Sequence, residues 1–124
     1  MMTGGLFVLA AAVSSTANPA LDGALVSYFQ CMDNAGIALE PSKEPAEIVA
    51  KAASFRCKRE LNSAVNIQKD DFISRSPTKE LVIEKGEYAI SPWILSTTKK
   101  IEDWGIERAV AAVVETRAKR FSKP

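Results

Sequence analysis

The two cysteines of this chain constrain its fold more than any other feature. Cys31 and Cys57 are the only cysteines among 124 residues. Their midpoint, residue 44, falls in the proline-flanked turn 41–45 (Pro-Ser-Lys-Glu-Pro). If the segments on both sides are helical, they form an antiparallel hairpin in which residues equidistant from the turn lie side by side. The spacing therefore predicts a disulfide between Cys31 and Cys57 that joins two helices.

The first of these helices is predicted to begin at Pro19, with Asn18 as its N-cap. Apolar residues recur at helical spacing along one face, and that face includes Cys31. Gly36 leaves two alternatives, because the helix either ends there or continues past a weak point. The residues of the apolar stripe are Leu21, Ala24, Leu25, Tyr28, Cys31, Met32, Ala35 and Leu39.

The second helix is predicted to begin at Pro45 and to have two apolar stripes. The stripe around Cys57 consists mostly of small residues, which allow the close backbone approach that a disulfide needs. The opposite stripe consists of Ile48, Ala52 and Phe55, and either a third layer of the chain covers it or it is exposed to a partner. The stripe around Cys57 contains Ala46, Ala50, Ala53, Leu61 and Ala64.

The segment 67–98 is predicted to be an irregular connection. Within it, the segments 80–83 (Glu-Leu-Val-Ile) and 88–90 (Tyr-Ala-Ile) flank a Glu-Lys-Gly-Glu sequence. They form either a short β-hairpin or one distorted helix.

A last helix is predicted over residues 99–121, beginning near Thr98 or at Asp103. Arg117 projects from its apolar stripe. Its guanidinium either reaches along that stripe to the surface beside Phe121, or Arg117 is a paired or ligand-binding arginine. The apolar stripe consists of Ile106, Val110, Val113, Val114 and Phe121.

An apolar run at residues 6–13 (Leu-Phe-Val-Leu-Ala-Ala-Ala-Val) precedes these helices. It is shorter than the roughly 20 residues that cross a bilayer. With Ser15 and Ala17 at the −3 and −1 positions, it predicts a signal peptide, residues 1–17, cleaved after Ala17. The alternative is a buried first helix of a cytosolic protein. Export agrees with the cysteine pair, because disulfides form in oxidising compartments.

The expected mature chain, residues 18–124, is therefore a single small helical domain. It is mainly α, with a disulfide-linked hairpin at 19–66, the connection 67–98 and a C-terminal helix, which together make a small three-helix-type bundle. The expected location is periplasmic or secreted, with no stable membrane anchor after cleavage.

The composition limits the available chemistry. The chain has no histidine, so it lacks the commonest general base and the commonest zinc ligand. A disulfide consumes both thiols, and no glycine-rich phosphate loop or CxxC motif occurs. These features predict a protein that is not an enzyme and that carries no cofactor or metal. The formal net charge of +1 gives no overall field that would attract nucleic acid.

The remaining functions are binding functions. We expect a small exported interaction or accessory protein, such as an inhibitor, an immunity factor or a subunit, that binds another protein or itself. The candidate interaction surface consists of Ile48, Phe55 and Arg117. In size, apolar leader, helical content and single disulfide, the chain also resembles the acid-activated periplasmic chaperones, which implies a stress-chaperone function as the alternative. That resemblance is one of architecture and assigns no residue. The chain is similar in general plan to small exported two-cysteine helical proteins of Gram-negative bacteria.

Overall fold

A computed structural model describes residues 18–122, and the chain is helical along most of that length. No β-strand occurs within the described residues, so the prediction of a mainly α protein is confirmed. The signal-peptide prediction falls on residues 1–17, outside the described part, and stays a prediction. The elements are α2 (Pro19–Leu39), α3 (Ala46–Arg56), α4 (Lys58–Ile73), α5 (Thr78–Lys85), the 3-10 helix η1 (Glu87–Ile90) and α6 (Ser91–Ser122).

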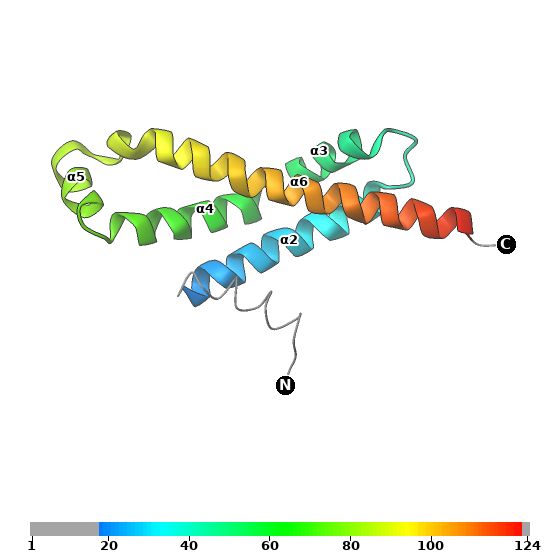
Figure 1. Cartoon of the computed structure of the whole chain (residues 1–124), viewed down its shortest axis with the longest axis horizontal. Helices are drawn as coiled ribbons and strands as arrows, with labels where there is room; N and C mark the ends of the chain where they lie inside the picture. The colour runs from blue at the N-terminus through cyan, green and yellow to red at the C-terminus, as the bar shows by residue number, and fades with distance from the viewer. Residues whose placement is uncertain (1–17, 123–124) are drawn as a thin grey trace.

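Helix α6 is the element on which the others are assembled. Its 32 residues correspond to a length of about 48 Å at 1.5 Å per residue. Figure 1 shows α3 and α4 following one another along α6 in the opposite direction, with α2 crossing the middle of the molecule. Helix α6 packs against α2, α3 and α4, and α2 also packs against α3 and α4. The core lies where these helices meet.

The core contains side chains from all four of these helices. Its largest fully buried members are Tyr28, Met32, Leu61 and Ile101, and alanines fill the narrower gaps. Close packing of small residues lets the helices approach closely. The buried cluster consists of Tyr28, Met32, Ala35, Ala50, Ala53, Cys57, Leu61, Val65, Ile101 and Ala109.

The start of α2 follows the prediction. Asn18 Oδ1 accepts a hydrogen bond from the backbone N–H of Leu21 at 3.1 Å, and Pro19 occupies the first helical position. The helix continues through Gly36 to Leu39. A Cβ at Gly36 would lie 3.2 Å from the carbonyl oxygen of Ala109. Glycine at this position therefore permits close contact between α2 and α6, and it does not end the helix.

The disulfide joins Cys31 and Cys57, so this prediction is confirmed. The two Cα atoms are 5.9 Å apart, within the range of about 4.4–6.8 Å that disulfides require. Cys57 is fully buried and lies at the junction between α3 and α4. The predicted second helix is thus two helices, the first of which begins at Ala46. Hydrogen bonds from Cys57 to Ala53 and from Leu61 to Cys57 continue the helical pattern across the junction.

The segment 67–98 is not irregular, and its β-hairpin alternative is wrong. Helix α4 continues to Ile73, and α5 and η1 occupy the segment assigned to the hairpin. A two-stranded hairpin is only marginally stable by itself, whereas a helix satisfies its backbone hydrogen bonds within one segment. Helix α5 ends at Gly86, whose φ of 82° favours glycine.

Helix α6 begins at Ser91, earlier than the predicted residue 99. Pro92 is its second residue, where a missing N–H costs nothing because the first turn has no intrahelical acceptors for its N–H groups. The Trp93 ring stacks on the Phe72 ring of α4, with centroids 4.1 Å apart. This stack attaches the beginning of α6 to α4.

The predicted apolar stripe of α6 is only partly correct, since Val114 and Phe121 are exposed. The buried positions are instead every fourth residue: Ile101, Gly105, Ala109 and Val113. Two of these four residues are too small to stand out in a hydrophobic pattern. Gly105 is covered by the Tyr28 ring, and Ala109 lies against Gly36 of α2.

Gly105 makes room for the fully buried ring of Tyr28. A Cβ at Gly105 would lie 2.6 Å from the Cε2 and Cζ atoms of that ring. Burial, together with the nearby carboxylates of Glu102 and Asp103, raises the pKa of Tyr28 to about 12, so the phenol is neutral at physiological pH.

Changing Gly105 to Ala is expected to destabilise the protein. Overpacking in a filled core costs about 1–3 kcal/mol, and the better helix propensity of alanine offsets only about 1 kcal/mol of it. Urea unfolding monitored by circular dichroism gives the measurement. Gly23→Ala is the matched control, because nothing lies within 4 Å of a Cβ at Gly23. Equal stability of the two variants would show that Tyr28 does not occupy the space beside Gly105.

Candidate interaction surface

Ile48 and Phe55 lie on the outward side of α3. Ile48 is 49% exposed and Phe55 is 77% exposed. Ala52, which lies between them along the helix, is exposed as well. Of the two alternatives for this stripe, the structure therefore has the exposed one, and no third layer of the described chain covers it.

The rotation of α3 about its axis explains this exposure. Ala50 and Ala53 on its other side are fully buried in the core shared with α2 and α6. The disulfide at Cys57 attaches the end of α3 to α2. With the small-residue side held inward, the stripe that contains Ile48 and Phe55 must face outward.

Basic residues accompany the apolar stripe from Ile48 onward, and the exposed Glu47 lies directly before it in the first turn of α3. Between Ile48 and Arg59 the chain carries four basic residues and no acidic one. All four are exposed, and Lys58 Nζ lies 5.9 Å from the centroid of the Phe55 ring, within reach of a cation–π interaction. We use the name α3 face for Ile48, Lys51, Ala52, Phe55 and Lys58.

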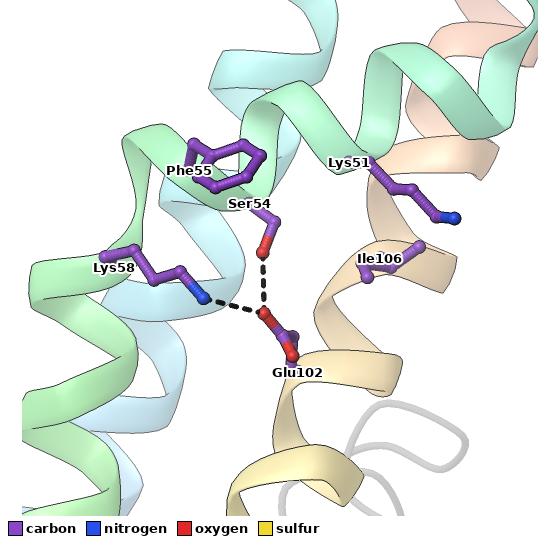
Figure 2. A pocket seen from close by; sticks show the side chains of 6 residues that line it. All are labelled: Lys51, Ser54, Phe55, Lys58, Glu102 and Ile106. Atoms are coloured by element: carbon purple, nitrogen blue, oxygen red, sulfur yellow. Dashed lines mark hydrogen bonds and ion pairs between the residues drawn. The ribbon is translucent and has the colours of Figure 1, made fainter.

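A hollow lies beside Phe55, between α3 and α6 (Figure 2). Its volume is about 220 Å³, less than the roughly 300–1,000 Å³ of typical small-molecule sites. Within it, Glu102 Oε2 accepts hydrogen bonds from Ser54 Oγ and Lys58 Nζ, each at 3.0 Å. The lining residues are Lys51, Ser54, Phe55, Lys58, Glu102 and Ile106. Phe55 and Ile106 are its apolar lining residues, and the other four are polar or charged.

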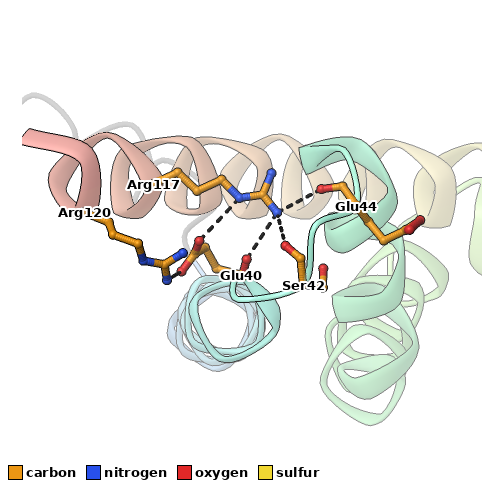
Figure 3. Close-up of polar contacts among 5 residues, drawn as sticks. All are labelled: Glu40, Ser42, Glu44, Arg117 and Arg120. Atoms are coloured by element: carbon orange, nitrogen blue, oxygen red, sulfur yellow. Dashed lines mark hydrogen bonds and ion pairs between the residues drawn. The ribbon is translucent and has the colours of Figure 1, made fainter.

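Arg117 does not lie on the α3 face but at the turn between α2 and α3 (Figure 3). Its Nη2 donates hydrogen bonds to the backbone carbonyl oxygens of Glu40 at 3.2 Å, Ser42 at 2.7 Å and Glu44 at 2.8 Å. Its Nε lies 3.4 Å from Glu40 Oε2, an ion-pair distance without hydrogen-bond geometry. The structure thus shows a paired arginine whose partners belong to its own chain.

The carboxylate of Glu40 lies between two guanidinium groups. Glu40 is 1% exposed, and its Oε1 accepts a hydrogen bond from Arg120. Sequence reasoning did not identify Glu40 or Arg120. One signal was available, because Arg117 and Arg120 are three residues apart and so share one side of α6, facing an acidic residue at the predicted turn.

The described part of the chain offers few other sites. Within residues 18–122, no group of three or more Cys, Asp and Glu side chains is placed to hold a metal ion. Both cysteines of this part are in the disulfide. No helix among these residues has the length and apolar character needed to cross a membrane.

The fold and this surface define a class: a small, disulfide-bonded helical protein that presents an exposed apolar and basic helix face. No protein-family model, curated protein or solved structure matches the chain.

Proposed function

We propose that this protein is a small exported, non-enzymatic interaction protein that binds another protein through the α3 face. Its fold is a small bundle in which α2, the consecutive helices α3 and α4, and α6 are the three helical segments. The observation that carries the proposal is the exposure of Phe55 beside Ile48 on a helix held in place by a disulfide. Exposed apolar residues that are grouped together and rimmed by charge mark interaction sites. Large aromatic side chains often contribute most to binding at such sites.

Export is the second part of this proposal. The disulfide supports it, because structural disulfides are rare in reducing compartments. An inhibitor, an immunity factor or an accessory subunit would have this combination of a rigid scaffold and one exposed binding face. Arg117 has a structural role here, since it holds the turn that precedes α3.

Photo-cross-linking in the native host tests the proposal. The cross-linking residue p-benzoylphenylalanine replaces Phe55 in one version of the full chain. In the control version it replaces Ile83, which is 75% exposed. Ile83 belongs to α5, a helix at the opposite end of the molecule from α3 in Figure 1. We expect the chain with the cross-linker at position 55 to form a one-to-one adduct with a single protein. The chain with the cross-linker at position 83 should form none. The intact mass of the recovered chain should correspond to a start at Asn18.

Two outcomes would contradict the proposal. Equal cross-linking at the two positions would indicate nonspecific contact with exposed apolar residues. A lack of any adduct at position 55 would show that the α3 face is not occupied in the host.

A chaperone of the acid-activated kind is the second candidate. One observation favours it: apolar side chains are also exposed at the other end of the molecule, including Ile83, Tyr88 and Leu95. Acidification to about pH 3 protonates ordinary carboxylates and so raises the net positive charge of a protein, which opposes its compact state. A chaperone should then bind much more hydrophobic dye at pH 3 than at pH 7 and prevent aggregation of unrelated proteins. A dedicated interaction protein should do neither.

A further inference from the structure

We infer that the partner segment that binds the α3 face is an acidic amphipathic helix. It inserts one apolar side chain into the hollow beside Phe55 and places its carboxylates against the surrounding basic residues. This inference rests on the proposed function and specifies the chemistry of the partner.

The charge distribution is the first argument. The whole chain has a formal net charge of +1, yet residues 48–59 carry four basic residues and no acidic one. Within residues 18–122, Lys51, Arg56 and Arg59 make no ion pair, so their charges are available to a partner. Complementary charge is what selects a partner and speeds its association.

The hollow itself adds no strong opposing charge. Among the described residues, Glu102 is the only acidic one that lines it, and Lys58 and Ser54 already bind the same oxygen of this carboxylate. In Figure 2, Lys51 stands at the other end of the hollow from Lys58. A carboxylate next to the inserted side chain could therefore pair with Lys51.

The shape of the surface is the second argument. Phe55 forms one wall of the hollow, and Ile106 of α6 is half-buried opposite it. The exposed residues Ile48, Ala52 and Phe55 follow helical spacing, and such a ridge packs into the groove between side chains of another helix. Helix α3 has 11 residues, which is about 16 Å, so a partner helix of about three turns would cover it.

Another hollow, between α2 and α6, does not offer the same chemistry. It has a volume of about 330 Å³, and its cation is Arg108. This guanidinium donates hydrogen bonds to both oxygens of Asp33, at 2.7 and 3.3 Å, and lies 5.3 Å from the ring centroid of Phe29. The cation of that hollow already has its partners, whereas Lys51, Arg56 and Arg59 near the α3 face make no ion pair within residues 18–122.

The test uses two fluorescein-labelled helical peptides of the same length. Both carry leucine at every third or fourth position, and their remaining positions are mainly glutamate in one and mainly lysine in the other. Each is titrated with the full oxidised protein, and binding is followed by fluorescence anisotropy. We expect the acidic peptide to bind at least about 10-fold more tightly than the basic one in 50 mM salt.

The affinity for the acidic peptide should fall in 300 mM salt, because exposed charges are then screened.

Two variants and two matched controls locate the site. Phe55→Ala and Lys51→Glu should each weaken binding of the acidic peptide by about 10-fold or more. Ile83→Ala and Lys79→Glu make the same kinds of change at an exposed apolar and an exposed basic residue of α5. They should leave the affinity for the acidic peptide unchanged. Circular dichroism confirms that each variant is folded.

Several results would overturn the inference. One is an equal affinity of the protein for the two peptides. Another is that the α5 control variants lose as much affinity for the acidic peptide as the Phe55→Ala and Lys51→Glu variants. Phe55-dependent binding to vesicles of anionic phospholipid without peptide binding would identify a membrane as the occupant. Phe55-dependent self-association in sedimentation would identify a second copy of the chain. If position 55 cross-links a partner through a segment that is not acidic, the inference of an acidic helix is wrong, while the proposed function, binding of a protein through the α3 face, stands. Absence of any cross-linked partner contradicts the proposed function itself.

Discussion

Replacing Cys31 and Cys57 together by serine is expected to lower the free energy of unfolding by about 3–4 kcal/mol. The disulfide closes a loop of 26 residues, and the chain-entropy model assigns about this value to such a loop. Domains of this size have a total stability of about 5–15 kcal/mol, so the loss is a large share of it. The α3 face depends on the same bond, because Cys57 ends α3.

Urea unfolding of three samples measures this effect: the oxidised protein, the reduced protein and the double serine variant. The reduced protein and the variant should unfold at similar urea concentrations, both well below the oxidised protein. Thiol titration of the unfolded but unreduced protein should detect no free thiol. Two titratable thiols, or a loss below about 1 kcal/mol, would contradict the assigned role of the disulfide.

Changing Arg117 to Met is expected to lower the free energy of unfolding by about 2–3 kcal/mol. The change removes the donor shared by three carbonyl oxygens of the turn 40–44 and leaves the buried Glu40 with Arg120 as its remaining ion-pair partner. Buried charges and acceptors that lose a partner cost several kcal/mol. Arg117 is 24% exposed on its side chain, so solvent reduces the loss. The snorkelling alternative predicts a loss of no more than about 1 kcal/mol.

The control for this prediction is Arg108→Met, which removes the half-exposed pair with Asp33. Exposed ion pairs contribute about 0–1 kcal/mol, and the contact of Arg108 with the Phe29 ring adds about 0.5–1 kcal/mol. The loss should therefore be smaller than for Arg117→Met. Arg117→Lys should recover little stability, because a compact ammonium cannot reproduce the planar donor geometry of the guanidinium. Equal stabilities of the Arg117→Met and Arg108→Met variants would show that Arg117 does not hold the turn.

The part of the fold that was predictable from the sequence depends on local geometry. A cysteine pair centred on a proline-flanked turn determines a hairpin, and the Asn18-Pro19 start is a local cap signal. Local sequence signals did not determine whether Ile48 and Phe55 would be exposed or buried. Periodicity shows that a helix has two apolar sides, but the positions of distant elements decide which side is covered.

Helix α6 is another element that the sequence pattern did not fully predict. The helix was predicted to begin near Thr98 or at Asp103, yet it begins at Ser91, with Pro92 in its first turn. Gly105, within the helix, leaves the space that the Tyr28 ring fills. The pairing of Arg117 was equally hidden. Its partners are carbonyl oxygens of a turn more than 70 residues away in the sequence, and backbone acceptors leave no trace in side-chain patterns.

Hydrogen exchange tests the central claim, that the α3 face is the binding surface, most directly. The full chain is compared alone and in complex with the partner identified by cross-linking at position 55. We predict slower amide exchange on binding over α3 (Ala46–Arg56) and around Glu102 and Ile106, with no change over Thr78–Ile90. Slower exchange over Thr78–Ile90 with none in α3 would contradict the claim.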